Sequence, residues 1–193
     1  MFIIGLTGPT GSGKSTFAAL LRTHGFFVAD GDAAARSVVQ PGSPLLPKLA
    51  DAFGADVLHN GTLDRKKLAQ RAFSSPDSLQ KLNALMHPEI DRILFAAIQA
   101  HDPCRAAVID AAALIESGIA DKCDLLAVTL APAEQRLERI MRRDNLTEEQ
   151  AKLRMQAQQP DAFYTSRADV VLHGYAPYDP EAELNKLLER VPL

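Results

Sequence analysis

Apolar residues gather in five short runs along the chain, and stretches with helical periodicity separate most of them. The runs span residues 2–6, 26–29, 106–110, 125–130 and 170–173. Short continuous apolar runs are typical of strands that are buried on both faces of a parallel sheet. Strands that alternate with helices place those helices on the two faces of the sheet. The sequence therefore predicts a three-layer α/β fold with a five-stranded parallel sheet.

The N-terminal segment predicts a strand, a glycine-rich loop, a helix and a second strand, in that order. After the loop, Phe17, Leu20 and Leu21 recur at helical spacing. Gly25 follows them and favours the left-handed conformation that commonly ends a helix. We therefore expect a helix that begins near Lys14 and ends before Gly25.

The stretch from residue 33 to 101 has helix signals but no convincing strand. Pro76 suits the first turn of a helix, and Leu79, Leu82 and Met86 follow it at helical spacing. Turn signals interrupt the stretch at Pro41-Gly42-Ser43-Pro44 and at Asn60-Gly61. We interpret it as a helical insertion that either covers an acceptor substrate or is a structural elaboration alone.

The composition fits one compact domain without a general affinity for polyanions. The chain has 193 residues, of which 47% are hydrophobic and 23% charged, and its net charge is -3. The hydrophobic residues are numerous enough to form one core. The negative net charge disfavours a general binder of nucleic acid or anionic membranes, because such proteins carry an excess of basic residues. The apolar run at 2–6 is far shorter than a signal sequence or a membrane span, so we expect a cytoplasmic protein.

The two cysteines, Cys104 and Cys123, carry no sign of metal or disulfide chemistry. Neither has the CxxC or CxxH spacing of a zinc site, and two cysteines make no disulfide framework. We expect buried or idle thiols in a reducing cytosol.

Residues 8–15 read Gly-Pro-Thr-Gly-Ser-Gly-Lys-Ser and match the phosphate-loop pattern GxxxxGK[ST]. In this motif backbone N–H groups surround the phosphates of a nucleotide, and the following helix start favours negative charge. At ordinary glycine frequency the pattern occurs by chance in on the order of one chain in a few hundred, and here it lies between a predicted strand and a predicted helix. We expect Lys14 to contact the β- and γ-phosphates and Ser15 to bind Mg²⁺. The other expected ATP contacts are Gly11, Ser12, Gly13 and Thr16.

Two carboxylates, Asp30 and Asp32, follow the second predicted strand. Ligands of α/β folds bind at the carboxyl ends of the strands, where the phosphate loop also begins. A carboxylate there can accept the proton of an attacking hydroxyl, as catalytic aspartates do in other kinases. Alternatively, Asp32 caps a helix predicted at residues 33–36, and Asp30 forms a turn before Gly31. Capping and catalysis by Asp32 are compatible.

A helix predicted over residues 133–143 carries four arginines. These are Arg136, Arg139, Arg142 and Arg143. Arg142 lies four residues after Glu138, which predicts an exposed ion pair. Arg139 and Arg143 have no acidic residue three or four positions away, and Arg136 shares their face. We expect this face to bind ATP phosphates and to stabilise a transferring phosphoryl group, whereas a solvated basic face is the alternative.

Beyond this helix the sequence predicts a lid. Thr147 and Gln150 have the spacing of a capping box, so a further helix is expected to start there and to stop at Pro160. Together with the polar segment 158–167, these helices resemble a mobile cover over the active edge of the sheet. Such a cover excludes water, which would otherwise hydrolyse ATP in an open kinase.

These residues resemble one family in particular, the dephospho-coenzyme A kinases, over nearly the whole chain. The matching segments are Ile4-Gly5-Leu6-Thr7-Gly8, Asp30-Gly31-Asp32 with Ala35-Arg36, Val39-Gln40-Pro41-Gly42-Ser43, Leu63-Asp64-Arg65, Leu82-Asn83-Ala84-Leu85-Met86-His87-Pro88, Leu114-Ile115-Glu116-Ser117-Gly118, and Arg143-Asp144 with Arg154 and Gln158. The resemblance implies a single P-loop kinase domain. Its core would span about 1–32, 102–132 and 168–193, with an acceptor-binding insertion at about 33–101 and a lid at about 133–167.

The resemblance also implies a reaction: phosphorylation of the ribose 3′-hydroxyl of dephospho-coenzyme A by ATP with Mg²⁺, the last step of coenzyme A synthesis. By resemblance, the base is Asp32, the phosphoryl clamps are Lys14 and Arg143, and the acceptor contacts are Asp32, Arg65 and His87. For His87, a core or turn histidine before Pro88 is the alternative.

The chain departs from the family pattern in three places. The family usually has Gly-Ile at Pro9-Thr10, proline at Ala112 and asparagine at His173. The loop change removes no phosphate ligand. No base contact is carried over to His173.

Two other functions remain open from the sequence. A kinase for a nucleoside monophosphate or a small metabolite would use the same chemistry on another acceptor. A nucleotide-dependent switch belongs to a different class, and GTP switches usually carry an Asn-Lys-x-Asp motif. The only Asn-Lys pair, Asn185-Lys186, is followed by two leucines, which disfavours a switch. The sequence sets neither nucleotide selectivity nor oligomeric state.

Overall fold

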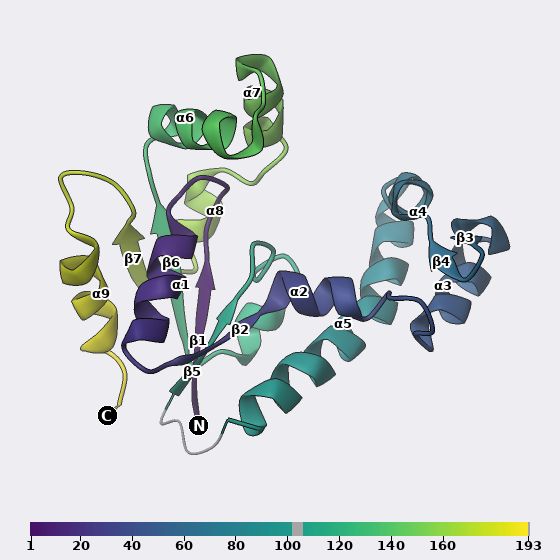
Figure 1. The fold of residues 1–193 in the computed structure, drawn as a ribbon, viewed down its shortest axis with the longest axis horizontal. Coiled ribbons are helices and arrows are strands. Elements are labelled where there is room, and N and C mark those ends of the chain that lie inside the picture. The colour runs from purple at the N-terminus through teal and green to yellow at the C-terminus, as the bar shows by residue number, and fades with distance from the viewer. Residues whose placement is uncertain (102–105, 193) are drawn as a thin grey trace. The chain divides into compact units, whose positions relative to one another are not determined.

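The computed structural model describes residues 1–101 and 106–192, and one part of it is built around a five-stranded sheet (Figure 1). Its strands, in the order β2-β5-β1-β6-β7, are β2 (Phe27–Asp30), β5 (Ala106–Asp110), β1 (Phe2–Thr7), β6 (Leu125–Leu130) and β7 (Val170–His173). The β1–β5, β1–β6 and β6–β7 pairs are parallel. This arrangement confirms the predicted strands and the α/β class.

The chain divides into two compact units, residues 1–29 with 100–193, and residues 30–99. The helices of the first unit are α1 (Lys14–Thr23), η2 (Ile119–Lys122, a 3-10 helix), α6 (Ala133–Asp144), α7 (Glu148–Gln156), α8 (Asp161–Thr165) and α9 (Pro180–Leu188). The second unit contains α2 (Gly31–Ser37), α3 (Leu45–Phe53), η1 (Ala55–Val57), β3 (Leu58–His59), β4 (Thr62–Leu63), α4 (Arg65–Ala72) and α5 (Pro76–Gln99).

Helices α1 and α9 cover one face of the sheet. Phe17 and Leu21 of α1 and Leu184 and Leu187 of α9 share a fully buried cluster with strand residues such as Leu6. Removing these large side chains from water supplies the main favourable free energy of this layer. The start of α1 is therefore held in a fixed position relative to the sheet.

The segment that follows β5 covers the other face. Gly5, in the middle of β1, lies so close to this segment that an added Cβ would be 2.7 Å from a Leu114 methyl carbon. Tyr164 of α8 is also buried, with 1% of its surface exposed. The sheet thus has helices or buried chain on both faces, as its continuous apolar strands predict.

The second unit corrects the expectation that residues 33–101 contain no strand. Strands β3 and β4 pair as a short antiparallel hairpin. Asn60 and Gly61 form its two-residue turn with φ of 49° and 74°, both in the left-handed region. Such turns favour Asn-Gly, so the predicted turn is confirmed. Strands of two residues are too short to give an alternating pattern, which is why the sequence did not reveal them.

Helix boundaries in the first unit follow their capping residues. Gly25, with φ of 84°, follows the C-cap of α1 as predicted. Thr147 and Gln150 form the predicted capping box at the start of α7. The prediction that Pro160 stops α7 is wrong, because this helix already ends at Gln156 and Pro160 is the N-cap of α8. Among the described residues, no helix is long and apolar enough to cross a membrane.

Candidate active site

The phosphate loop joins the carboxyl end of β1 to the first turn of α1, as the sequence predicts. Gly8 packs so closely on β6 that an added Cβ would lie 2.4 Å from the Thr129 carbonyl oxygen. Gly13 has φ of 100° and an added Cβ would lie 3.0 Å from Gly174 Cα. Gly8 must be glycine because a side chain would have no space there. Gly13 must be glycine because space is short and its backbone is left-handed.

The start of α1 is suited to an anion. Its N-cap, Gly13, provides no side-chain hydrogen bond, and the first turn contains no acidic residue. The first N–H groups of a helix have no partner within the helix, and the helix dipole adds partial positive charge there. Ser15 and Thr16 lie exposed in this first turn. A phosphate group can therefore approach these N–H groups and hydroxyls.

A hydroxyl chain fixes the loop to the sheet. The Thr129 hydroxyl donates to the Thr7 carbonyl at 3.2 Å and lies 2.6 Å from the Ser12 hydroxyl. Because the Thr129 proton is used on Thr7, Ser12 is the donor in the shorter contact. Both hydroxyls are buried, with exposure of 1% or less.

Lys14 contacts a carboxylate that the sequence analysis missed. Its Nζ forms an ion pair with Asp110 Oδ1, and both side chains are largely buried. Asp110 ends β5, whose register places it beside Leu6 just before the phosphate loop. The available signal was an acidic residue at the end of an apolar strand that forms part of the ligand-binding edge.

Arg136 of α6 is buried and bonded to the phosphate loop. Its Nε donates to the Thr10 carbonyl at 3.0 Å, and its two terminal nitrogens reach Asp161 Oδ1 at 3.0 Å and Gln158 Oε1 at 3.4 Å. Gln158 Oε1 also accepts from the Thr10 N–H at 2.9 Å. Both backbone groups of Thr10 are thus bonded to the segment that was predicted to be a lid.

The other three arginines of α6 differ from one another. Arg139 donates to the Gly11 carbonyl at 3.0 Å. Arg143 makes two hydrogen bonds of 2.8 Å to Asp144 and lies 3.4 Å from the Thr10 hydroxyl. Arg142 is exposed, and no ion pair with Glu138 is found within the described residues, so that predicted pair is wrong.

Asp144 is the counterion of two arginines. Besides Arg143 it accepts from Arg154 of α7 at 2.5 Å. The hydrogen bond from Arg143 is the main reason why the pKa of Asp144 lies below its usual value. The same hydrogen bond raises the pKa of Arg143. Arg143 therefore lies beside the loop, and a neighbouring carboxylate already compensates its charge.

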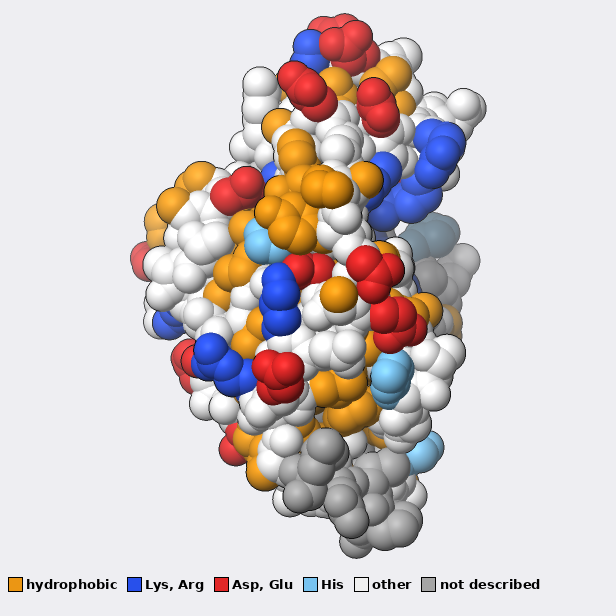
Figure 2. Space-filling model, turned by 90° about the vertical axis from the view of Figure 1, so that its left-hand side faces the viewer, with side chains coloured by type: hydrophobic (Ala, Val, Ile, Leu, Met, Phe, Trp, Pro, Cys, Tyr) orange, Lys and Arg blue, Asp and Glu red, His pale blue; other side chains and the backbone are white. Residues whose placement is uncertain are grey.

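A hollow of about 300 Å³ adjoins the first turn of α1. It is lined by Thr16, Phe17, Arg139, Gly174, Tyr175, Ala176, Pro177, Tyr178 and Pro180. Figure 2 views the side that carries α9 and shows apolar side chains gathered there above basic and acidic ones. This hollow lies next to the phosphate loop, and its walls are mainly apolar and aromatic, as in most small-molecule sites.

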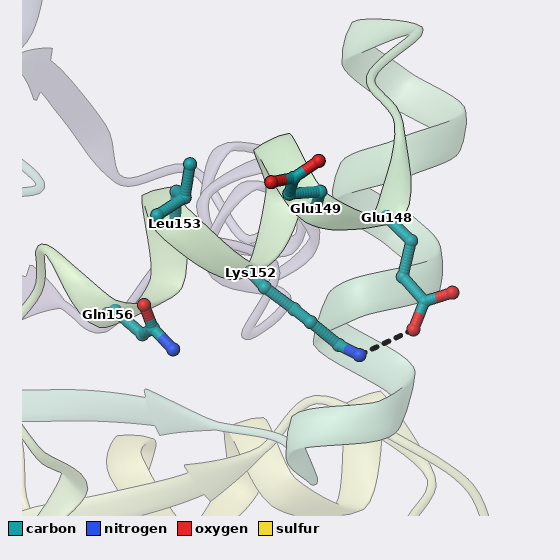
Figure 3. A pocket seen from close by; sticks show the side chains of 5 residues that line it. All are labelled: Glu148, Glu149, Lys152, Leu153 and Gln156. Carbon is teal, nitrogen blue, oxygen red and sulfur yellow. Dashed lines mark ion pairs between the residues drawn. The ribbon is translucent and has the colours of Figure 1, made fainter.

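A second hollow, of about 460 Å³, lies on α7 alone (Figure 3). Its lining residues are Glu148, Glu149, Lys152, Leu153 and Gln156, and Lys152 pairs with Glu148 at 2.6 Å. No residue of the phosphate loop lines it, and two carboxylates disfavour an anionic ligand. It is therefore a poor candidate for a nucleotide site.

In the second unit, the aspartate that caps α2 is Asp30 and not Asp32. Asp30 is the N-cap of α2, and its side chain accepts from the Ala33 N–H at 2.8 Å. The alternative that Asp32 caps this helix is therefore wrong, because α2 begins two residues earlier than expected. Asp32 lies in the first turn, half-buried and without a capping role.

The remaining predicted acceptor contacts also lie in the second unit. Arg65 begins α4 and donates to the Arg36 carbonyl at 3.4 Å. Arg36 lies 3.9 Å from Asp30 in a weak ion pair. His87 lies within α5, directly before Pro88, so this X-Pro pair does not end the helix. The alternative of a turn histidine at this position is therefore wrong, whereas a core role of His87 stays open.

Cys123 lies in surroundings that make its thiol unreactive. Cys123 is partly buried, and burial raises the pKa of its thiol to about 12. Thiolate formation is then negligible at neutral pH, in agreement with the predicted idle thiol. Cys104 lies outside the described residues.

Comparisons with known proteins agree with this geometry. The family model described as dephospho-CoA kinase matches residues 2–177. A dephospho-CoA kinase of Corynebacterium glutamicum is 40% identical over 195 residues, which covers 99% of this chain and 98% of that protein. The chain belongs to the dephospho-CoA kinase family. The predicted family resemblance is confirmed, and membership of the dephospho-CoA kinases makes this chain a kinase with ATP as co-substrate.

Solved structures support the same family and fold. A Thermus thermophilus protein of known crystal structure has a TM-score of 0.85 and 34% identity, with 100% of this chain and 98% of that chain covered. The dephospho-CoA kinase of Campylobacter jejuni has a TM-score of 0.66 and 25% identity, with 98% and 96% covered. A shikimate kinase of Acinetobacter baumannii, at 13% identity and a TM-score of 0.52, shares the fold alone. The predicted P-loop kinase fold is thus confirmed.

Proposed function

We propose that this member of the dephospho-CoA kinases transfers the γ-phosphoryl group of ATP to the ribose 3′-hydroxyl of dephospho-CoA, giving CoA and ADP in the cytoplasm. The observation that carries the proposal is the phosphate loop, held between β1 and α1, in a chain of this family. The step breaks the bond from the γ-phosphorus to the bridging oxygen and forms a bond from phosphorus to the ribose oxygen. The hydroxyl proton leaves to a base.

The phosphates of ATP bind to the loop and the start of α1. Backbone N–H groups of Gly11, Gly13, Lys14 and Ser15 surround them, the hydroxyl of Thr16 adds a contact, and Lys14 Nζ reaches the β- and γ-phosphates. The Ser12 and Thr16 N–H groups donate to the Pro9 and Gly13 carbonyls and shape the loop. In the structure Lys14 is held by Asp110, so its ammonium is oriented before the nucleotide arrives. A preorganised positive group stabilises the charge that develops during transfer without reorganising water.

Arg139 and Arg143 extend this positive surface from α6. Arg139 is bonded to the loop carbonyl of Gly11, and Arg143 lies beside Thr10 with Asp144 as its counterion. Bidentate guanidinium groups suit phosphate oxygens, and Arg143 can exchange its carboxylate partner for one. Arg143 then acts as a phosphoryl clamp.

The residues around the loop fit a magnesium ion. Mg²⁺ prefers oxygen ligands and is usually bound by one or two protein groups together with substrate phosphates. The exposed hydroxyl of Ser15 is the expected ligand, and the Asp110 carboxylate ends the adjacent strand. When bound, the ion neutralises phosphate charge.

Asp32 serves as the base that accepts the proton of the 3′-hydroxyl. Two features support this role: β2 belongs to the same sheet as β1, and Asp32 follows β2 by two residues. The capping of α2 by Asp30 is compatible with this role, because Asp32 is then not the residue that caps the helix. A half-buried carboxylate within reach of a hydroxyl is a suitable general base for phosphoryl transfer.

The unit of residues 30–99 supplies the acceptor contacts. Arg65 and His87 are the proposed contacts, and a guanidinium group suits the phosphates of dephospho-CoA. Residues 133–167, which are bonded to the loop through Arg136 and Gln158, form the proposed lid. The base of ATP occupies the hollow between Arg139 and the loop that follows β7.

An acceptor panel tests the proposal. Purified enzyme with ATP and Mg²⁺ is given dephospho-CoA, a nucleoside monophosphate or shikimate, and ADP release is followed. We expect turnover with dephospho-CoA at least about 100-fold above the others, which corresponds to ~2.7 kcal/mol of discrimination. Equal or greater turnover with another acceptor would reject the proposed substrate and favour a different small-molecule kinase.

A further inference from the structure

Glu183 is a buried carboxylate that the reaction does not use directly. It lies on α9 with 2% of its surface exposed, on the same buried side as Leu184 and Leu187. A buried charge is unfavourable unless it is paired and hydrogen-bonded. Glu183 accepts from the His173 N–H at 2.8 Å, lies 2.9 Å from His173 Nδ1 and pairs with Lys186 Nζ.

These contacts fix the chemical state of Glu183. Burial alone would raise its pKa, but the hydrogen bonds from Lys186 and His173 outweigh burial and leave the pKa below its usual value. Glu183 is therefore a carboxylate near neutral pH. It directs the Nδ1 edge of the His173 ring toward α9 and fixes the plane of that ring.

The His173 ring in turn supports an aromatic cluster. It stacks on Tyr178 with centroids 4.2 Å apart and planes at 17°, and it meets Tyr175 edge-on at 5.8 Å. Tyr175 and Tyr178 also meet edge-on, at 5.1 Å. The loop between them is closed by a hydrogen bond of 3.0 Å from the Tyr178 N–H to the Tyr175 carbonyl.

This cluster forms a wall of the hollow beside the phosphate loop. Tyr175 and Tyr178 line the hollow together with Thr16 and Arg139. Gly174, between His173 and Tyr175, contacts the phosphate loop so closely that an added Cβ would lie 2.1 Å from the Ser12 carbonyl oxygen. The cluster therefore has a fixed position next to the phosphate loop.

We propose that Glu183 is a positioning residue which acts through His173 to hold Tyr178 and Tyr175 as the aromatic wall for the base of ATP. The inference rests on the proposed function for the identity of the nucleotide. Planar purines bind well against aromatic and guanidinium groups, and Tyr178, which is 40% exposed, has surface left for such a contact. The wall acts on the base and leaves the phosphates to the loop.

Two variants separate this role from general stability. In Glu183→Gln the side chain keeps one acceptor oxygen but has no negative charge, so it no longer forms ion pairs with Lys186 and His173. The KM for ATP should therefore rise about tenfold. The kcat at saturating ATP and the KM for dephospho-CoA should stay within about twofold of wild type. Glu181→Gln, on the exposed face of the same helix, is the matched control and should leave all three values unchanged.

Tripolyphosphate serves as a probe that has the phosphates without the base. Its affinity, measured by calorimetry, should be the same in wild type and Glu183→Gln, whereas the affinity for ATP should fall about tenfold. An equal loss for both ligands, or no loss for either, would overturn the positioning role. Tyr178→Ala removes an exposed ring without touching the core, so it repeats the test if Glu183→Gln does not fold.

Tyrosine emission reports on the wall directly. The chain has three tyrosines and no tryptophan, and Tyr164 is buried outside the hollow. ATP should quench the emission of Tyr175 and Tyr178 in wild type, with free tyrosine amide as the inner-filter control, and tripolyphosphate should not. Emission that is unchanged by ATP would overturn the proposed wall. Failure to phosphorylate dephospho-CoA would instead reject the proposed function, so the two failures are distinguishable.

Discussion

Arg136 donates a hydrogen bond from Nε to the Thr10 carbonyl at 3.0 Å, so a buried guanidinium of α6 is bonded directly to the phosphate loop. The Thr10 N–H is bonded to Gln158 at 2.9 Å, and therefore neither backbone group of Thr10 remains for a nucleotide. Arg136 also pairs with Asp161 at the start of α8. This arrangement makes Arg136 a positioning residue that joins the loop to the proposed lid.

Replacing Arg136 should disturb the loop more than replacing an exposed arginine of the same helix. Arg136→Met leaves the Thr10 carbonyl without its donor, and loss of a charged hydrogen bond costs about 1.5–3 kcal/mol. We expect kcat/KM for ATP to fall about 10- to 100-fold in steady-state assays. Arg142→Met should remain within about twofold of wild type. Equal kinetics in the two variants would contradict the positioning role.

The proposed base can be separated from its neighbouring cap. Asp32→Asn should retain ATP binding, measured by calorimetry, but lose at least about 100-fold in kcat, since an amide does not accept the hydroxyl proton. Asp30→Asn is the matched control because asparagine caps helices as well as aspartate does. Turnover by Asp32→Asn at the level of this control would rule out Asp32 as the base.

Asp144 should stabilise the α6–α7 region in a pH-dependent way. Because the hydrogen bond from Arg143 lowers its folded-state pKa, its contribution is present above the unfolded pKa of about 3.9 and is lost as pH falls through the folded value. The urea midpoints of wild type and Asp144→Asn should therefore differ by a constant amount from pH 7 to 5 and converge below about pH 4. A difference that persists unchanged at acidic pH would contradict this ion pair.

Cys123 should resist alkylation in the folded protein. Its pKa of about 12 leaves little thiolate at pH 8. In a Cys104→Ser background, iodoacetamide should modify Cys123 at least about 100-fold more slowly than in urea, as followed by mass spectrometry. Rapid modification of the folded protein would show that the thiol is more accessible than its environment here allows.

The sequence was sufficient for features that depend on near neighbours. The five strands, the phosphate loop, Gly25 after α1 and the Thr147–Gln150 capping box each follow from spacing within a few residues. Asp30 could also have been recognised as a cap, since it precedes its partner Ala33 by three residues. The error came from placing the start of α2 too late.

Contacts between segments that lie far apart in the sequence could not be predicted from local spacing. Lys14 meets Asp110 and Ser12 meets Thr129 because the parallel strands bring their carboxyl ends together, and no local spacing encodes such a pair. The helical pattern placed Arg136 on a phosphate-binding face, but the packing of α6 directs it to the Thr10 carbonyl.

Arg143 shows a further limit of helical spacing. Adjacent residues do not face each other within a helix, so helical spacing does not predict a pair between Arg143 and Asp144. Asp144 is, however, the last residue of α6, and Asn145 follows with φ of 51°. The helix ends there, and the two side chains can meet.

The transfer reaction itself is the most direct test of the account. Enzyme, Mg²⁺ and ATP labelled in the γ-phosphoryl group are incubated with dephospho-CoA, and the product is identified by mass spectrometry and phosphorus NMR. We predict that the label appears as a 3′-phosphate on the ribose of CoA, with one ADP formed for each label transferred, and that Lys14→Met abolishes the transfer. Release of the label as inorganic phosphate, with dephospho-CoA unchanged, would contradict it.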